Sequence, residues 1–179
     1  MKHEKLLVFI VTYNSSFRLK KILDKLKKLN RKISFNILIS DDCSIDDTKK
    51  YFPKKRTKNI YLNINKKNLG YGGNVKKCIK FALSKKYHYA VMIHGDNQYD
   101  TKYIPNLLNK IQKTNYDAVT GSRMINAKNA LNGKMPLYKF IGNLVLTNFF
   151  NLVFKTNFTD AHTGLWMYNL KTLEYNLIK

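Results

Sequence analysis

The sequence predicts an α/β fold with a mostly parallel central sheet flanked by helices. Short apolar runs recur along the 179 residues, and each is followed by a polar turn and then by a stretch with helical spacing. This alternation is typical of repeated strand–helix–strand units. The length and the 44% hydrophobic content suffice for one buried core, so we expect a single domain over residues 1–179.

The apolar runs place the expected strands at 6–12, 35–40, 60–64, 89–94 and 118–121. Helices are expected at 17–29, from the glycine cluster at 70–73 through residue 83, at 104–111 and at 136–154. In the last helix a narrow polar stripe recurs at every fourth position, at Lys139, Asn143, Thr147 and Asn151. We expect this helix to be too polar to span a bilayer and to pack into the core, with a membrane-surface position as the alternative.

The net charge of +22 favours polyanionic partners, namely nucleic acid, an anionic membrane surface or phosphorylated substrates. A lysine-rich composition that simply solvates helix faces explains the charge equally well. Nucleic acid is not expected, because arginines are few and no nucleic-acid-binding motif occurs. The two cysteines, Cys43 and Cys78, are far apart in the sequence, which fits a reducing compartment, and we expect a cytoplasmic location.

Acidic residues are concentrated just after two of the expected strands. In an open parallel sheet, ligands bind beyond the carboxyl ends of the strands, so these positions are informative. Asp41 and Asp42 are adjacent carboxylates after the second strand, and we expect them to accept hydrogen bonds from a nucleotide base or ribose. Asp46 and Asp47 are better explained as N-caps of a short helix over 48–52.

Two further loops are candidates for binding phosphate and metal. Asp96 and Gln98 offer one ionised and one neutral oxygen ligand on a short loop, which suits Mg²⁺ or Mn²⁺ that takes other ligands from substrate phosphates. An Asx-type turn without metal is the alternative. Asn68 and Gly70 begin a glycine-rich segment before a helix, where the backbone can approach a phosphate. Tight-turn geometry explains the glycines equally well.

Taken in order, these segments resemble the inverting glycosyltransferases of family two, and within it the branch of dolichol-phosphate mannosyltransferases and polyprenyl-phosphate glycosyltransferases. The resemblance covers nearly the whole chain and implies a GT-A, Rossmann-like fold. The matching segments are Val11-Thr12-Tyr13-Asn14, Asp41-Asp42-Cys43-Ser44-Ile45-Asp46, Asn68-Leu69-Gly70, His94-Gly95-Asp96-Asn97-Gln98, Gly121-Ser122-Arg123 and Asp160-Ala161-His162-Thr163-Gly164-Leu165.

The resemblance implies a role for each matching residue. Asp96 and Gln98 would hold the metal on the donor diphosphate, with Asp96 in the catalytic centre, and Arg123 would meet a phosphate on the acceptor. The nucleotide of a UDP- or GDP-sugar would be held by Thr12, Tyr13, Asn14, Asp41, Asp42, Asn68 and Gly70.

The implied reaction is inverting transfer of a sugar to a polyprenyl phosphate, by a protein in the cytoplasm or peripheral at the inner face of the cell membrane. An ionised phosphate needs no general base. Transfer to a hydroxyl of a growing cell-surface glycan is the alternative acceptor chemistry and needs a base, for which Asp160 is the candidate.

The sequence departs from the pattern of this branch at several points. His94 stands in place of an Asp in the metal motif, Ser15 in place of a common Glu, and Trp166 where a cation is common. The chain ends at Lys179, soon after the last motif, so we expect a fragment truncated at the C-terminus. A truncated, non-catalytic nucleotide-binding domain is therefore a further alternative.

Overall fold

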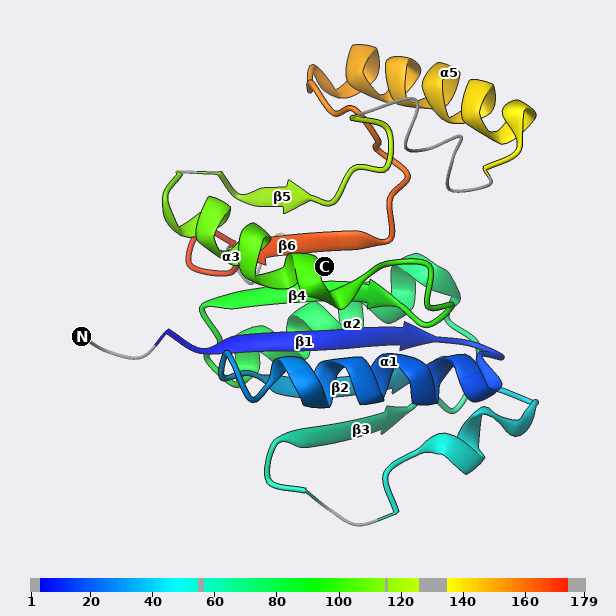
Figure 1. The fold of residues 1–179 in the computed structure, drawn as a ribbon, viewed down its shortest axis with the longest axis vertical. Helices are drawn as coiled ribbons and strands as arrows, with labels where there is room; N and C mark the ends of the chain where they lie inside the picture. The colour runs from blue at the N-terminus through cyan, green and yellow to red at the C-terminus, as the bar shows by residue number, and fades with distance from the viewer. Residues whose placement is uncertain (1–3, 55–56, 115, 126–134, 174–179) are drawn as a thin grey trace. The chain divides into compact units, whose positions relative to one another are not determined.

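The computed structural model describes residues 4–54, 57–114, 116–125 and 135–173. The expected α/β fold is confirmed: the described residues form a six-stranded sheet in the order β3-β2-β1-β4-β6-β5 (Figure 1). The strands are β1 Leu6–Thr12, β2 Asn36–Asp41, β3 Ile60–Ile64, β4 Tyr89–His94, β5 Ala118–Thr120 and β6 Leu165–Asn169. The helices are α1 Ser16–Leu29, α2 Gly70–Ser84, α3 Ile104–Gln112 and α5 Leu137–Phe154, with 3₁₀ turns η1 Asp47–Tyr51 and η2 Thr101–Tyr103.

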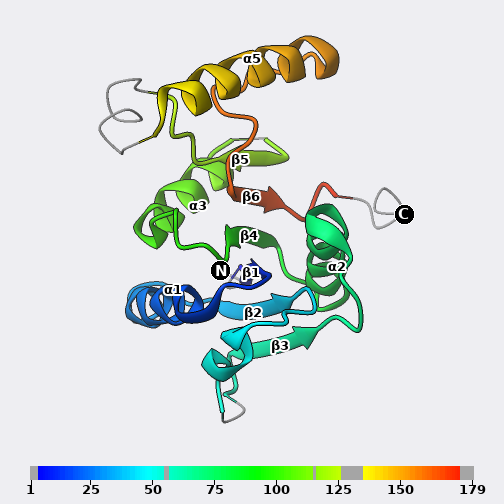
Figure 2. The same cartoon turned by 90° about the vertical axis from the view of Figure 1, so that its right-hand side faces the viewer.

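Strand β1 lies at the centre of the sheet and is buried along its whole length. It pairs in parallel with β2 and β4, so that Phe9 lies beside Leu38 on one side and Met92 on the other. Helices α1 and α3 cover one face and α2 the other (Figure 2). A strand covered on both faces has no solvated side, which is why β1 reads as a continuous apolar run rather than an alternation.

Strand β6 is not among the elements expected from the sequence. Its hydrogen bonds with β5 show that the two strands are antiparallel: Asn169 N donates to Asp117 O at 2.8 Å, and Gly121 N donates to Leu165 O at 2.9 Å. Buried and half-buried residues alternate along β6, which is the pattern of a strand with one less protected face. The sheet is therefore mixed at this edge.

The chain divides into two compact units. The first comprises Met1–Val119 and Trp166–Lys179, and the second comprises Thr120–Leu165. The expectation of a single domain over 1–179 stays a prediction. Within the first unit lie α1, α2, α3 and the parallel strands, and within the second lies α5.

The expectation that α5 packs into the core is wrong, because its apolar face is the exposed one. Ten large hydrophobic side chains between Leu137 and Phe154 are exposed, whereas Thr147 is the one fully buried residue of the helix. Thr147 Oγ1 accepts the N–H of Ala161 at 3.2 Å, and Asn151 bonds both the N–H and the carbonyl of Phe158. Thr147 and Asn151 of the polar stripe thus face the second unit's own chain, whereas Lys139 is exposed.

The expected polarity of this helix also needs correction. The residues Leu137–Phe154 have a mean hydropathy of 1.2, and among the described helices α5 is long and apolar enough to cross a membrane by length and composition. One such helix is weak evidence for a membrane span. The polar stripe therefore does not make α5 too polar to span a bilayer, as had been expected from the sequence.

The turns after β1 and β2 are tied together by the side chain of Thr48. Its buried hydroxyl accepts the N–H groups of Ser15 at 2.7 Å and Ser16 at 2.8 Å, and it donates to Asp46. Asp46 is the N-cap of η1, as expected, since its carboxylate accepts the Thr48 N–H at 3.0 Å. The same expectation is wrong for Asp47, which lies in the first turn and pairs with Lys50.

We predict that Thr48→Val lowers the free energy of unfolding by about 1–3 kcal/mol, because the buried N–H of Ser15 and the half-buried N–H of Ser16 lose their acceptor while the side-chain volume is kept. Urea denaturation measures this loss. The matched control is Asp47→Asn, which removes an exposed ion pair and is expected to change stability by less than about 1 kcal/mol. Equal effects of the two substitutions would contradict the role of Thr48.

Candidate functional site

The carboxyl ends of β1, β2 and β4 meet at one edge of the sheet. The strand register places Thr12 beside Asp41 and Val11 beside His94. Backbone hydrogen bonds extend the pairing beyond the strands: Asp42 N donates to Thr12 O at 2.9 Å. The candidate residues of the first unit therefore gather at the edge where ligands of parallel sheets bind.

The adjacent carboxylates Asp41 and Asp42 make different contacts. Asp41 is fully buried, and its two oxygens accept the N–H and the hydroxyl of Ser44, so it closes the turn after β2. Asp42 instead uses Oδ1 to accept Asn65 Nδ2 at 2.8 Å and Leu69 N at 2.9 Å. Asp42 is thus linked to the segment between β3 and α2, where Asn68 and Gly70 lie.

The hydroxyl of Thr12 is a buried polar atom without a hydrogen bond in the described part of the chain. Such an atom requires an explanation, and a bound ligand is one. Gly95 lies close by: a Cβ at this position would be 2.7 Å from Ser15 Oγ and 2.9 Å from Thr12 Oγ1. Glycine therefore lets the loop after β4 approach the end of β1.

Tyr13 and Asn14 follow Thr12 in the same turn. Tyr13 is exposed, whereas Asn14 adopts a φ of 50° and accepts the Ile45 N–H through Oδ1 at 3.1 Å. The Asn14 backbone N–H donates to Ser44 Oγ at 2.9 Å. Asn14 therefore joins the turns after β1 and β2, and nucleotide binding by Tyr13 and Asn14 stays a prediction.

Asn68 and Gly70 form the turn that begins α2. Asn68 Oδ1 accepts the Gly70 N–H at 2.8 Å, and Gly70 has a φ of 72°, which L-residues with a side chain adopt with strain. Turn geometry therefore accounts for this glycine. Phosphate binding by the same segment stays a prediction.

A buried network of amide side chains supports this edge of the sheet and was not expected from the sequence. Asn74 Oδ1 accepts Ser40 Oγ at 2.6 Å, and Asn74 Nδ2 donates to the Ser40 carbonyl at 3.0 Å. Asn63 donates to Ser40 Oγ and to Asn65 Oδ1, and Lys77 Nζ donates to Asn65 Oδ1 at 2.6 Å. The sequence signal for this network is the alternation of Asn63 and Asn65 with apolar residues, together with Asn74 on the buried face of α2.

The loop after β4 contains the candidate metal ligands Asp96 and Gln98. The backbone N–H of Gln98 donates to Asp96 Oδ1 at 3.0 Å, so the Asx-type turn that was the alternative is present. His94 Nδ1 lies 3.0 Å from Asp96 Oδ2, an ion-pair distance for a protonated imidazole, but it is not aligned for a hydrogen bond.

The carboxyl group of Asp96 is held in its ionised form. Burial by itself raises its pKa, but the contacts with His94 and the Gln98 N–H, together with the charge of Arg18, outweigh burial and lower the pKa below its ordinary value. An ionised carboxylate beside an exposed amide is a donor set suited to a hard divalent ion that keeps other ligands. The described residues contain no group of three or more acidic, histidine or cysteine side chains able to hold a metal.

Trp166 packs against aromatic neighbours in the first unit. Its ring stacks on Tyr168 with centroids 6.1 Å apart, and Tyr168 stacks on Phe9 at 6.4 Å. Both residues of β6 belong to the apolar side of the sheet that α2 covers. The place where a cation was expected in this branch is therefore occupied by part of the apolar packing.

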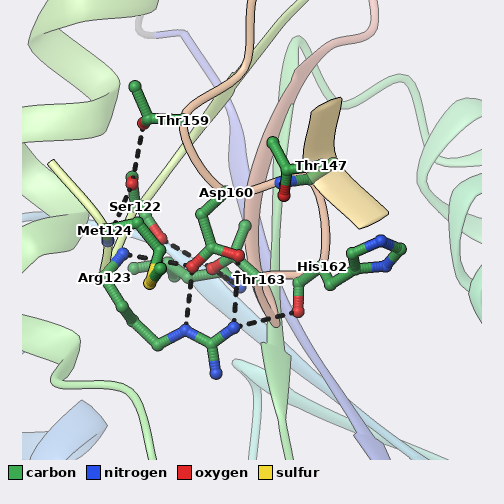
Figure 3. A network of polar contacts seen from close by, with 11 residues as sticks. Ser122, Arg123, Met124, Thr147, Thr159, Asp160, His162 and Thr163 are labelled. Carbon is green, nitrogen blue, oxygen red and sulfur yellow. Dashed lines mark hydrogen bonds and ion pairs between the residues drawn. The ribbon is translucent and has the colours of Figure 1, made fainter. Parts of the chain in front are cut away.

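In the second unit, Arg123 and Asp160 form a bidentate ion pair (Figure 3). Arg123 Nε donates to Asp160 Oδ2 at 2.8 Å, and Nη2 donates to Asp160 Oδ1 at 3.2 Å and to the His162 carbonyl at 3.3 Å. The Asp160 side chain is fully buried, while that of Arg123 is 28% exposed. Thr163 Oγ1 donates to the Gly121 carbonyl at 2.6 Å, which closes the same loop.

The chain is similar to known proteins. A model of glycosyl transferase family 2 matches residues 7–175. A dolichyl-phosphate beta-glucosyltransferase of Dictyostelium discoideum is 35% identical over 130 residues, which are 65% of this chain and 39% of that protein. A UDP-N-acetylglucosamine–dolichyl-phosphate N-acetylglucosaminyltransferase of Methanococcus voltae is 30% identical, covering 96% of this chain and 72% of that protein.

Solved structures agree on the fold. Glucosyl-3-phosphoglycerate synthase from Mycobacterium tuberculosis, in complex with UDP, has a TM-score of 0.66 at 12% identity, covering 94% of this chain and 58% of that chain. The same enzyme with Mn²⁺, UDP and phosphoglyceric acid gives a TM-score of 0.61. At this identity the likeness concerns the fold alone. The chain spans 65% and 63% of the length of two uncharacterized relatives from Methanocaldococcus jannaschii.

We predict that Asp160→Asn lowers the free energy of unfolding of the second unit by about 3 kcal/mol, because the buried guanidinium contacts lose their counter-charge and face an amide N–H₂ instead. Hydrogen exchange read at 120–124 and 158–164 measures the change. His162→Ala is the control, since only its backbone carbonyl takes part. Unchanged protection in Asp160→Asn would contradict a structural pairing.

Proposed function

The chain belongs to glycosyl transferase family 2, and we propose that this GT-A domain transfers a sugar, with inversion, from a nucleotide-sugar to a polyprenyl phosphate at the cytoplasmic face of a membrane. Relatives named for dolichyl-phosphate acceptors support the choice of acceptor. The observation that favours it most is the bidentate pairing of Arg123 with the buried Asp160, because it orients the guanidinium and engages Asp160, the base candidate of the alternative reaction.

We assign the donor site to the edge of the sheet in the first unit. Thr12 contributes a buried hydroxyl that lacks a hydrogen bond within the described residues. Asp42 contributes a carboxylate that accepts a hydrogen bond from Asn65, the residue after β3. Tyr13, Asn14, Asn68 and Gly70 border the same edge in this proposal. Asp41 has a supporting role, because both of its oxygens are bonded to Ser44.

Asp96 with Gln98 would hold the divalent ion. Bound Mg²⁺ or Mn²⁺ would neutralise the negative charge that develops on the departing nucleoside diphosphate. The chain's own contribution is to keep Asp96 ionised and to fix its loop: Lys25 Nζ donates to Asn97 Oδ1 at 3.0 Å, and Asn97 adopts a φ of 61°. The Lys25–Asn97 hydrogen bond thus attaches the loop of Asp96 to α1, and it does not involve the metal ion.

Arg123 would bind the phosphate of the acceptor. A guanidinium fixed by a bidentate carboxylate keeps one plane and one orientation, and the Arg123 side chain is 28% exposed to solvent. A phosphate acceptor is already ionised at neutral pH and needs no base. Transfer to a glycan hydroxyl is the second candidate, and it would require Asp160 to give up its buried pairing.

Helix α5 would rest at the membrane surface. Ten large apolar side chains of α5 are exposed, as in an interfacial helix, and Thr147 and Asn151 are used for contacts inside the second unit. The net charge of +22 adds attraction to an anionic surface, with about 1 kcal/mol for each Lys or Arg close to it. The protein would then be cytoplasmic and peripheral at the inner face of the membrane.

We predict that Asp96→Ala abolishes Mn²⁺-dependent binding of the nucleotide-sugar, because Gln98 alone supplies no charge to offset dehydration of the ion. Calorimetry with and without Mn²⁺ measures it, and the control is the exposed Asp24→Ala. The pKa of Asp96 lies below its ordinary value, so the carboxylate stays ionised through the usual Asp titration range, and binding is expected to be lost only as pH falls through the lowered pKa. Unchanged affinity in Asp96→Ala rules out the metal assignment.

We predict that Arg123→Lys slows transfer from radiolabelled donor to a short-chain polyprenyl phosphate by about tenfold, because an ammonium cannot reproduce the bidentate geometry. Hydrolysis of the donor by water is measured in the same samples and is expected to stay unchanged. A soluble glycan is offered as a second acceptor. Efficient transfer to the glycan, with a rate that requires a deprotonated base, would put the alternative acceptor first.

We predict that Phe149→Gln with Leu152→Gln weakens flotation of the protein with anionic liposomes, because these side chains are 65% and 79% exposed on the apolar face. Asn148→Gln, at an exposed position of the same helix, is the control. High salt is expected to reduce flotation of all variants. A protein that ignores anionic liposomes at low salt does not use α5 as a membrane surface.

A further inference from the structure

We infer that Lys77 and Asn65 are positioning residues for the nucleoside of the donor, acting through Asp42. Lys77 Nζ donates to Asn65 Oδ1 at 2.6 Å, and Asn65 Nδ2 donates to Asp42 Oδ1 at 2.8 Å. This chain of contacts runs from the outer part of α2 to the end of β2. The inference rests on the proposed function, in which the Asp42 carboxylate binds the base or ribose. Lys77 and Asn65 would fix the orientation of that carboxylate.

The ammonium group determines which way the amide of Asn65 points. Lysine has three donors and no acceptor, so the atom that it contacts must be the amide oxygen. Asn63 Nδ2 donates to the same oxygen at 3.1 Å. Turning the amide by 180° would set its N–H₂ against two donors and its oxygen against the Asp42 carboxylate. Lys77 therefore keeps the donor side of Asn65 toward Asp42.

The two bonds to Asp42 both engage one of its oxygens. Asn65 Nδ2 and Leu69 N donate to Oδ1, and Oδ2 makes no hydrogen bond within the described residues. A carboxylate fixed through one oxygen presents the other as an acceptor for a base N–H or a ribose hydroxyl. Asp41 differs, because Ser44 takes both of its oxygens.

Lys77 is the part of this chain that can be changed without disturbing the core. Asn65 and Asn74 are buried, and Asn74 Oδ1 also accepts from Asn65 at 3.3 Å, so substitution at either position alters the fold as well. Lys77 reaches the network from an exposed position on α2. Lys77→Met keeps the aliphatic stem and removes the ammonium, and the neighbouring exposed Lys76→Met is the matched control.

The experiment measures binding of UDP, GDP and inorganic pyrophosphate by calorimetry in the presence of Mn²⁺. Lys77→Met is expected to weaken binding of the preferred nucleoside diphosphate by about tenfold, the usual effect of a hydrogen bond to a charged group. Pyrophosphate affinity, which does not involve the nucleoside, is expected to stay unchanged. Lys77→Arg is expected to restore nucleoside diphosphate binding, and Lys76→Met to match the unaltered chain.

A double-mutant cycle with Asp42→Asn tests whether Lys77 acts through Asp42. In the Asp42→Asn background, Lys77→Met is expected to cause no further loss, because the two residues act as a unit. Additive losses, an equal fall in pyrophosphate affinity, or unchanged nucleoside diphosphate affinity in Lys77→Met would each overturn the inference. If the unaltered chain binds neither UDP nor GDP, the proposed function fails, and the inference fails with it.

Discussion

Burial of β1 on both faces is the constraint from which the rest of the first unit follows. Every backbone polar group of β1 must pair with β2 or β4, and no side chain along it can be charged without a large desolvation penalty. Polar chemistry is therefore confined to the residues just beyond the strand ends. The change from apolar to polar side chains begins at Thr12, the last residue of β1. Its backbone still belongs to the sheet, and its side chain carries a buried hydroxyl.

The strand ends are supported by neutral amides rather than by buried ion pairs. Ser40, Asn63, Asn65 and Asn74 exchange hydrogen bonds in the interior, and the one ammonium of this network enters from the surface of α2. Amides have both donors and acceptors, so they fix the direction of a hydrogen-bond chain with little of the desolvation penalty of charges. In the first unit, the amide network bonds the buried carboxylate of Asp42 through Asn65, whereas in the second unit the buried Asp160 pairs with a partly exposed arginine.

Sequence patterns predicted the elements that have a simple period or a long apolar run. The bounds of β1, β3 and β4 agree with the expected ones, and α1 begins one residue earlier than expected. Strand β6 was missed because its short mixture of apolar and aromatic residues directly follows a turn motif. The amide network could not be predicted, because a polar residue in a strand is informative only once its neighbours in space are known. Helix α5 shows the same limit: periodicity identified its two faces but not which of them turns inward.

The inverted orientation of α5 changes how substitutions in this helix act. In an ordinary amphipathic helix, the outward positions accept many residue types and the inward positions require apolar ones. In α5, Thr147 and Asn151 make specific hydrogen bonds inward, so their replacement by hydrophobic residues removes contacts that shape the loop. Exposed positions such as Leu152 can accept other apolar side chains, whereas the exposed Phe154 also contacts Phe150. Natural variation along α5 should therefore be broad among hydrophobic residues at positions such as Leu152 and narrow at Thr147 and Asn151, the reverse of the rule for helices in water.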